Sequence, residues 1–226
     1  MTGLDGPRLP PRSSGPARRL VVLLHGVGAD GSDLIGLAPF FAEAFPDAAF
    51  AAPDAPFPCD MAAFGRQWFS LQDRDPARLA AGMRAVEPVV RAFLRDELQR
   101  LALPASALAL VGFSQGAMTA LHTGLRMAEP PAAILAYSGA LLSPESLVAD
   151  RAATGAAAPP VLLVHGESDG VVPVAASRLA ESALRAAGIP VEALYIPGLD
   201  HSIDGAGLAA GTAALSAAFA PSQPDA

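Results

Sequence analysis

The sequence predicts one α/β domain with a mostly parallel, doubly wound sheet flanked by helices. Short β-favouring apolar runs alternate with segments of helical spacing, the pattern of parallel strands joined by right-handed helical crossovers. The 226 residues suit one sizeable core, and no segment is large enough for a separate lid domain. We expect this domain at 19–220, after a loosely ordered lead-in at 1–18 that is rich in Pro, Gly, Ser and Arg, and before a tail at 221–226.

The ordered part of the chain should begin with a strand at 20–24. This continuous apolar run is typical of a strand that is buried on both faces of a parallel sheet. A glycine-rich turn over 25–31 follows it. Ser32 can then cap a helix whose apolar residues keep one face as far as Phe45, and 48–52 is expected to be a short second strand.

A long irregular segment at 53–74 comes next. It is longer than a compact domain normally tolerates without a purpose, which makes it a candidate wall for a binding site. Asp75 and Pro76 are a good helix opening, with the aspartate as cap and the proline at the first position. Because Pro88 falls inside the helical pattern, we expect a kink or break near Glu87.

The second half of the chain repeats the strand and helix alternation. The expected strands are 108–111, 132–137, 161–164 and 191–196, and the expected helices are 117–125, 173–187 and 206–219. A loop at 152–160, rich in Ala, Gly and Pro, precedes the third of these strands.

The pentapeptide Gly112-Phe113-Ser114-Gln115-Gly116 joins a predicted strand to a predicted helix. A Gly-x-Ser-x-Gly in that context is typical of a nucleophile elbow, a strained turn that projects the serine Oγ above the carboxyl edge of the sheet. The two glycines let the strand and the helix approach closely. Alone, the motif is also compatible with an ordinary turn, so the other catalytic groups must decide.

A serine hydroxyl needs a base to act as a nucleophile at neutral pH, and the base needs an acid to orient it. In a doubly wound sheet these groups belong in loops that follow other strands. Asp169 follows the strand at 161–164, and His201 follows the strand at 191–196. The order Ser114, Asp169, His201 along the chain is that of the α/β-hydrolases.

Other residues could take these roles. His25 and His165 each precede a glycine at a strand end, where a local hydrogen bond is the more common role. His122 lies two helical turns beyond the serine, and we expect it to be structural. Glu167 is a substitute for the acid, whereas Asp200 is the weaker choice because it adjoins the candidate base and neighbouring side chains turn apart.

An acyl-transfer site also needs two donors for the negative charge that develops on the carbonyl oxygen. The backbone N–H of Gln115 is one candidate, because it follows the serine at the positive end of the helix that starts there. The backbone N–H of Val27, in the turn after the first strand, is the other. A phosphate-binding glycine loop is the weaker interpretation of that turn, because no Lys-Ser/Thr pair follows it.

Composition narrows the choice of partners. The formal net charge of −7 argues against nucleic acid. No window approaches the ~18 to 20 apolar residues of a membrane span, and the lead-in lacks the apolar run of a signal peptide. We therefore expect a cytoplasmic protein without stable membrane insertion. The single cysteine, Cys59, excludes an intramolecular disulfide and a cysteine-based metal cluster.

Five motifs, in order from about residue 20 to 220, resemble the phospholipase/carboxylesterase family, which includes the acyl-protein thioesterases. They are His25-Gly26-Val27-Gly28 with Asp30-Gly31, Pro53-Asp54-Ala55-Pro56 leading to Trp68-Phe69, Gly112-Phe113-Ser114-Gln115-Gly116-Ala117-Met118, His165-Gly166 with Asp169 and Val172-Pro173, and Gly198 with His201.

The resemblance implies the α/β-hydrolase fold and hydrolysis of carboxylic esters, thioesters or lysophospholipids through an acyl-serine intermediate, without a metal or cofactor. It assigns Ser114 as nucleophile, His201 as general base and acid, and Asp169 as the residue that orients the histidine. Val27 and Gln115 become the oxyanion donors. The partner is then a small-molecule ester or thioester, and a homodimer is left open because the family includes monomers and dimers.

The acyl pocket is harder to place, because Cys59-Asp60-Met61-Ala62 departs from the family pattern. We expect a shallow cleft, walled by 53–74, that prefers short to medium acyl chains. The candidate contacts, each equally compatible with plain core, are Met61, Phe64, Trp68, Leu71, Leu142 and Val172.

Two other functions are compatible with the same fold. A lactonase similar to dienelactone hydrolase usually has a cysteine at the elbow, where this chain has Ser114. A catalytically silent ligand-binding relative would have lost a member of the triad, and all three residues are present.

Overall fold

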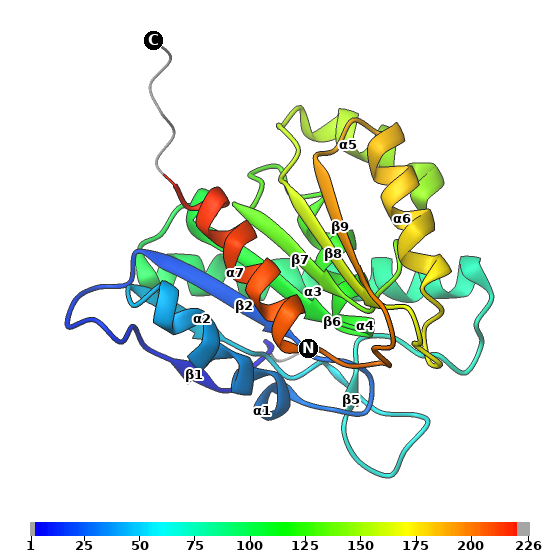
Figure 1. Ribbon diagram of the computed structural model, residues 1–226, viewed down its shortest axis with the longest axis horizontal. Coiled ribbons are helices and arrows are strands. Elements are labelled where there is room, and N and C mark those ends of the chain that lie inside the picture. Colours follow the sequence, from blue (N-terminus) through cyan, green and yellow to red (C-terminus); the bar gives the residue numbers. More distant parts are fainter. Residues whose placement is uncertain (1–2, 221–226) are drawn as a thin grey trace.

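A seven-stranded sheet with the order β1-β3-β2-β6-β7-β8-β9 forms the centre of the computed structural model, which describes residues 3–220 (Figure 1). The strands are β1 (Arg8–Leu9), β2 (Arg19–Leu24), β3 (Ala48–Ala51), β6 (Leu108–Phe113), β7 (Ala133–Tyr137), β8 (Val161–Gly166) and β9 (Val191–Ile196). Only the pairing of β1 with β3 is antiparallel in this sheet. The predicted doubly wound, mostly parallel sheet is confirmed.

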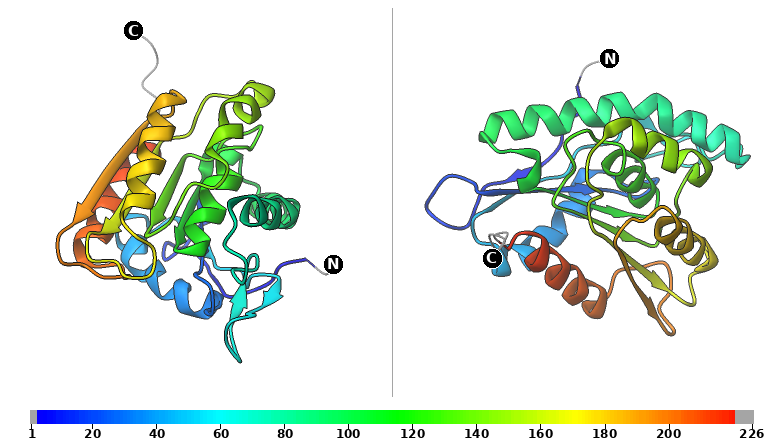
Figure 2. Two further views of the ribbon diagram at one scale, coloured as in Figure 1. Left: turned by 90° about the vertical axis from the view of Figure 1, so that its right-hand side faces the viewer. Right: turned by 90° about the horizontal axis from the view of Figure 1, so that it is seen from above.

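Helices cover both faces of the sheet (Figure 2). They are α1 (Gly31–Leu34), α2 (Ala38–Ala44), α3 (Pro76–Leu101), α4 (Gln115–Gly124), α5 (Pro144–Thr154), α6 (Ala175–Ala186) and α7 (Gly205–Ala218), with 3₁₀ turns at Ile35–Leu37 and Ala105–Ala107. One core cluster packs the sheet against α3, α4 and α6, and the other packs it against α2 and α7. Alternate residues of β2 point to opposite clusters, as the two-residue period of a strand requires.

The first helical segment differs from the prediction at its start and in its middle. The N-cap is Asp30 rather than Ser32, and its side chain accepts a hydrogen bond of 2.8 Å from the Ser32 amide. The expected continuous helix is divided into α1, a 3₁₀ turn and α2. Pro39 stands in the first turn of α2, and since it has no N–H it ends the hydrogen-bond ladder that comes from α1.

The helix α3 begins as predicted but is not broken. The Asp75 carboxylate caps it by accepting from the amides of Ala77 and Arg78 at 3.0 and 3.2 Å. The helix then runs through Pro88 without a break over 26 residues, so of the kink or break expected near Glu87 the break is wrong and the kink stays a prediction. Pro88 and Arg84, one turn earlier, are both exposed, so water can bond the carbonyl that the proline leaves without a donor.

The lead-in differs from the expectation of a loosely ordered segment. Within its described part, β1 pairs with β3, and the carbonyls of Pro7 and Asp5 accept hydrogen bonds from Ala52 and Asp54 at 3.0 and 2.7 Å. Arg8 also bonds the buried Glu97 of α3 through its Nε, at 2.9 Å. Two strand residues give no apolar pattern, so sequence periodicity could not reveal this edge pairing. The predicted tail at 221–226 lies outside the described residues.

The segment 53–74 contains a two-stranded hairpin of β4 (Phe57–Pro58) and β5 (Arg66–Gln67), which the sequence did not predict. The helix α5 is a second unpredicted element. Among residues 3–220, no helix combines the length and the apolar character that crossing a bilayer requires.

Candidate active site

Ser114 stands in the tight turn between β6 and α4. Its backbone has φ 54° and ψ −117°, a conformation that costs a non-glycine residue on the order of 1–3 kcal/mol. Two glycines make the turn possible. A Cβ at Gly112 would collide with the Gly116 carbonyl, and a Cβ at Gly116 would collide with the Leu24 carbonyl of β2. The geometry is that of the predicted elbow.

Three side chains from separate loops meet at the carboxyl edge of the sheet. The Ser114 Oγ lies 3.0 Å from His201 Nε2, and His201 Nδ1 lies 2.6 Å from Asp169 Oδ2. Because the carboxylate only accepts, Nδ1 carries the proton and Nε2 is free to accept from the serine hydroxyl. The His201 ring also packs against the Phe113 ring, with centroids 4.8 Å apart.

Asp169 is a buried carboxylate with a full set of donors. Its Oδ1 accepts from the amides of Val171 and Val172, both at 2.8 Å, while its Oδ2 faces His201. Burial alone would raise the pKa of this carboxyl, but the hydrogen bonds from His201 and the two amides outweigh it and hold the pKa below its usual range. Asp169 is therefore ionised at neutral pH and can stabilise an imidazolium.

The two expected oxyanion donors lie in turns beside the serine. Gln115 is the first residue of α4, so its amide cannot bond within the helix and sits at the positive end of the dipole. In the hydrogen bonds of residues 3–220, the Val27 amide has no acceptor either. The next residue, Gly28, fixes the conformation of this turn. Its amide donates to the Arg66 carbonyl at 2.8 Å, and its φ of 82° is one that glycine adopts readily.

The Gln115 side chain has a role that the sequence did not reveal. Its Oε1 accepts from the Trp68 amide at 2.8 Å and its Nε2 donates to the Phe69 carbonyl at 2.7 Å. The elbow therefore holds the end of the 53–74 segment in place. A buried amide side chain needs hydrogen-bond partners for both its oxygen and its nitrogen. That requirement was the only sequence clue that Gln115 bonds to another segment.

Trp68 corrects one expectation about the acyl pocket. Its side chain is fully buried in the core, and its indole N–H donates to the His25 carbonyl at 2.9 Å. It therefore supports the turn after β2 rather than lining a cleft. A buried indole needs an acceptor for its N–H, and here a backbone carbonyl supplies it.

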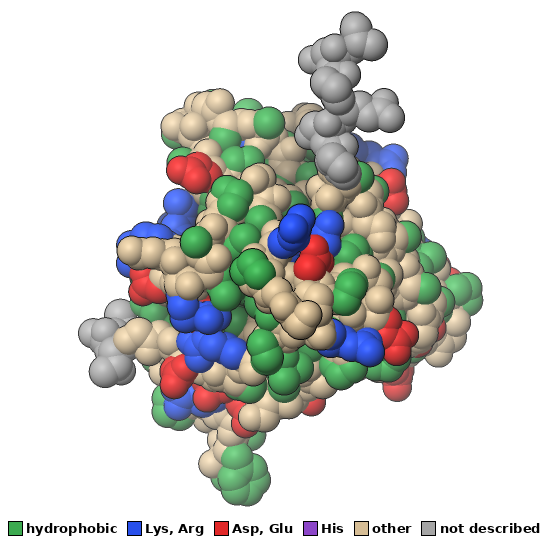
Figure 3. Space-filling model, turned by 90° about the vertical axis from the view of Figure 1, so that its left-hand side faces the viewer, with side chains coloured by type: hydrophobic (Ala, Val, Ile, Leu, Met, Phe, Trp, Pro, Cys, Tyr) green, Lys and Arg blue, Asp and Glu red, His purple; other side chains and the backbone are tan. Residues whose placement is uncertain are grey.

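The other acyl-pocket candidates have very different environments. Met61 and Phe64 are 51% and 84% exposed on the loop between β4 and β5, which projects from the molecule (Figures 1 and 3). Leu71 and Leu142 are half-buried against the core. Val172 is also half-buried, and its amide donates to the Asp169 carboxylate. Leu71, Leu142 and Val172 are thus partly accessible, whereas the two loop residues face solvent.

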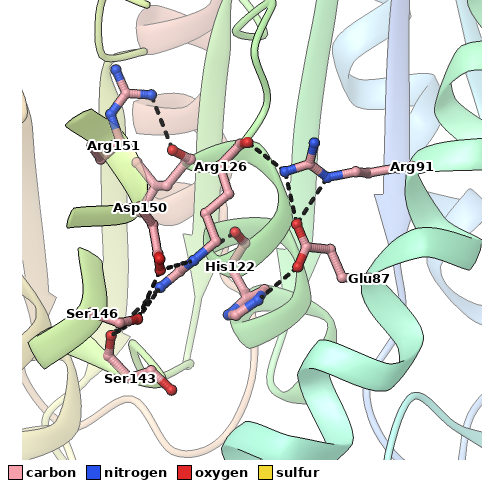
Figure 4. Close-up of polar contacts among 9 residues, drawn as sticks. Glu87, Arg91, His122, Arg126, Ser143, Ser146, Asp150 and Arg151 are labelled. Atoms are coloured by element: carbon pink, nitrogen blue, oxygen red, sulfur yellow. Dashed lines mark hydrogen bonds and ion pairs between the residues drawn. The ribbon is translucent and has the colours of Figure 1, made fainter. Parts of the chain in front are cut away.

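The alternative histidines do not reach the serine. The Nε2 of His25 accepts from the Ala55 amide at 3.0 Å, and burial lowers the pKa of this imidazole. His122 lies 3.2 Å from Glu87 in a separate polar cluster between α3, α4 and α5 (Figure 4). His165 bonds to Ser177 and to the Val172 carbonyl.

The alternative acids are also occupied elsewhere. Glu167 pairs with Arg178 at 2.7 Å, and Asp200 accepts from the Ser202 hydroxyl at 2.5 Å. The structure thus brings together the three residues that the sequence selected, and within residues 3–220 none of the substitutes has a hydrogen bond to Ser114 or His201.

Comparisons with known proteins show what the chain resembles. A model of the phospholipase/carboxylesterase family matches residues 11–217. Esterase YpfH of Escherichia coli (strain K12) is 34% identical over 192 residues, 84% of this chain and 78% of that protein. A protein of Oryza sativa subsp. japonica, named a probable inactive carboxylesterase, is 29% identical over 205 residues, 86% of this chain and 82% of its own. The crystal structure of esterase PE8 has a TM-score of 0.90 and 44% identity, covering 96% of this chain and 100% of the other.

Proposed function

The chain belongs to the phospholipase/carboxylesterase family, and we propose that it is a serine carboxylesterase that works through an acyl-serine intermediate. Membership of the family would not by itself support an active enzyme, because one relative is named a probable inactive carboxylesterase. The observation that carries it is the hydrogen-bonded series from Ser114 through His201 to the ionised Asp169. That geometry supplies a nucleophile, a general base and an orienting acid within direct reach of one another.

The proposed reaction has two half-reactions. The Ser114 Oγ attacks the ester carbonyl carbon while His201 Nε2 takes the hydroxyl proton, and the amides of Val27 and Gln115 receive the developing oxyanion. His201 then returns the proton to the leaving alcohol or thiol as the C–O or C–S bond breaks. Water then attacks the acyl carbonyl while the same imidazole takes one of its protons, and as the bond between the acyl carbon and Oγ breaks, the imidazole returns that proton to Oγ and the carboxylic acid leaves.

The nucleophile can be tested with a fluorophosphonate probe and one substitution. Ser114→Ala should abolish labelling and lower kcat/KM for a p-nitrophenyl ester by about 10⁴-fold or more, because triad members act as a unit. Ser182→Ala, an exposed serine of α6, is the matched control and should behave like the wild type. Retention of more than a few per cent of activity in Ser114→Ala would show that the nucleophile is elsewhere.

Substrate size is proposed to be short to medium in the acyl part. Support comes from the half-buried Leu142 and Val172, which offer limited apolar surface, and from the full burial of Trp68. In a series of p-nitrophenyl esters, kcat/KM should therefore peak between butanoyl and octanoyl chains. A steady rise beyond dodecanoyl would contradict the preference, and parallel thioester substrates would show whether sulfur leaving groups are favoured.

The cytoplasmic location that the sequence suggests and the open question of a homodimer stay predictions, as does the boundary between the domain and a tail at 221–226.

A further inference from the structure

A second histidine touches the carboxylate that orients His201. His165 is the penultimate residue of β8, and its side chain and that of Asp169 are both completely buried. The His165 Nε2 lies 3.1 Å from Asp169 Oδ2, the same oxygen that accepts from His201 Nδ1 at 2.6 Å. One carboxylate oxygen therefore stands between two imidazoles, of which the reaction proposed above uses only one.

The partners of His165 fix where its proton sits. Its Nε2 also lies 2.8 Å from the Val172 carbonyl, and a carbonyl and a carboxylate can only accept, so Nε2 carries a proton. On the other side of the ring, the Ser177 hydroxyl of α6 lies 2.6 Å from Nδ1. Ser177 is itself buried and lies 3.2 Å from the Gly139 carbonyl. The imidazole is thus held from both ends.

This arrangement ties His165 to Asp169 twice. Through space, Nε2 lies 3.1 Å from Oδ2, so the partial positive charge of its N–H group is close to that oxygen while the N–H itself bonds the Val172 carbonyl. Through the chain, it holds the carbonyl of Val172, whose amide donates to the other carboxylate oxygen, Oδ1, at 2.8 Å. A buried carboxylate that is held at both oxygens cannot rotate away from His201, and a donor near Oδ2 also lowers the basicity of that oxygen.

We propose that His165 is a positioning residue, which sets the orientation and the basicity of Asp169 and so tunes His201, with Ser177 as its support. This inference rests on the proposed esterase mechanism. His165 has no part in the bonds that form and break. Its effect reaches the reaction only through Asp169.

No other charged pair of the described residues competes for this carboxylate. From the β8 loop and α6, Glu167 and Arg178 pair with each other, and from the β9 loop Asp200 bonds to Ser202. The groups that face Asp169 are the imidazoles of His165 and His201 and the two valine amides. A substitution of His165 should therefore act on Asp169 and, through it, on His201 alone.

The test compares His165→Leu with His165→Gln, whose side-chain amide can place an N–H near the position of Nε2. We expect His165→Leu to lower kcat/KM for p-nitrophenyl butanoate on the order of tenfold, as loss of a partner that orients a functional group does. We also expect the acid limb of the kcat/KM profile to move to higher pH by roughly half a unit, because a more basic Asp169 favours the imidazolium. His165→Gln should restore much of both effects, and Ser177→Ala should show them in weaker form.

A buried histidine outside the site serves as the control. His122→Leu removes the partner of Glu87 and should lower stability while leaving the acid limb unmoved. Lower activity of His165→Leu with an unchanged acid limb would reduce His165 to a packing residue and overturn the proposal. If His165→Leu does not fold, an unmoved limb in both His165→Gln and Ser177→Ala overturns it equally. Activity that survives in Ser114→Ala would instead remove the esterase mechanism itself.

Discussion

Hydrogen bonds to neighbouring residues hold the strained backbone of Ser114 in place. Its Oγ is directed at His201, its carbonyl accepts from the amides of Ala117 and Met118, and its own amide donates to the Tyr137 carbonyl at 2.9 Å. The strain is therefore supported by hydrogen bonds on both sides of the residue. A small displacement of this turn would lengthen the distance from Oγ to His201 Nε2 on which the proton transfer depends.

Gly116→Ala tests how tightly this turn is packed. In an ordinary helix, alanine is more stabilising than glycine. At position 116, however, the alanine Cβ would collide with the Leu24 carbonyl. We expect a loss of roughly 1–3 kcal/mol in the free energy of unfolding, measured with urea, together with lower esterase activity. Gly36→Ala, where a Cβ meets nothing within 4 Å, is the control and should be neutral or slightly stabilising. Equal stability of the two variants would contradict this account.

Sequence reasoning at this scale succeeded where a residue carries its own chemical signature. The serine, the aspartate and the histidine each follow a strand and occur in a known order. Trp68 was left open between the acyl pocket and the core, because a buried aromatic ring and one that lines a cleft look the same in a sequence, and the structure places it in the core. The local hydrogen bond expected for His165 is found with the Val172 carbonyl, whereas its contact with Ser177 could not be foreseen because that serine comes from α6.

At the scale of elements, α5 is attached to the body mainly by polar contacts. Leu147 is its only fully buried side chain. Arg126, which is 7% exposed, reaches across from the end of α4, donating to Asp150 Oδ2 at 2.7 Å and to the Ser146 hydroxyl at 3.1 Å (Figure 4). The weak apolar pattern explains why the sequence did not predict this helix, whereas the core strands, which are mostly apolar, were found within a residue or two.

Arg126→Met should loosen this attachment. We expect a loss of about 2 kcal/mol in the free energy of unfolding, less than the ~3–5 kcal/mol of a fully buried pair, because the Asp150 side chain is 38% exposed. Limited proteolysis should also cut within 144–154 faster than in the wild type. Arg84→Met, on the exposed face of α3, is the control for loss of a positive charge. Equal losses of stability and equal proteolysis in the two variants would show that Arg126 does not attach α5.

Over the whole molecule, several carboxylates are held ionised by their partners. Burial would raise the pKa of Glu87, but the hydrogen bond to His122 and the charge of Arg91 outweigh it, and the pKa falls below its ordinary value of 4.5. The pKa of Asp150 is likewise lowered against the effect of burial, by Ser146 and Arg126. A group whose pKa is lowered by folding stabilises the protein above its unfolded pKa, and this contribution is lost as the pH falls through the folded value.

Glu87→Gln should therefore flatten the acid side of the stability curve. The variant should be less stable than the wild type at pH 7, and the difference should shrink as the pH falls below about 4.5, where the carboxylate of the unfolded chain takes up a proton. Urea unfolding between pH 7 and pH 3 measures this. Glu43→Gln, an exposed residue of α2, should run parallel to the wild type, and a constant gap for Glu87→Gln would refute the linkage.

The edge strand β1 has a consequence for synthesis. Arg8 bonds Glu97, which lies 89 residues further along the chain, so β1 is synthesised well before the α3 residue that it contacts. At about 5–20 residues per second, that delay is on the order of ten seconds. During that interval β1 can be held on β3 only by its short backbone pairing, without the Arg8–Glu97 contact, and a weakly covered edge strand can pair with another chain.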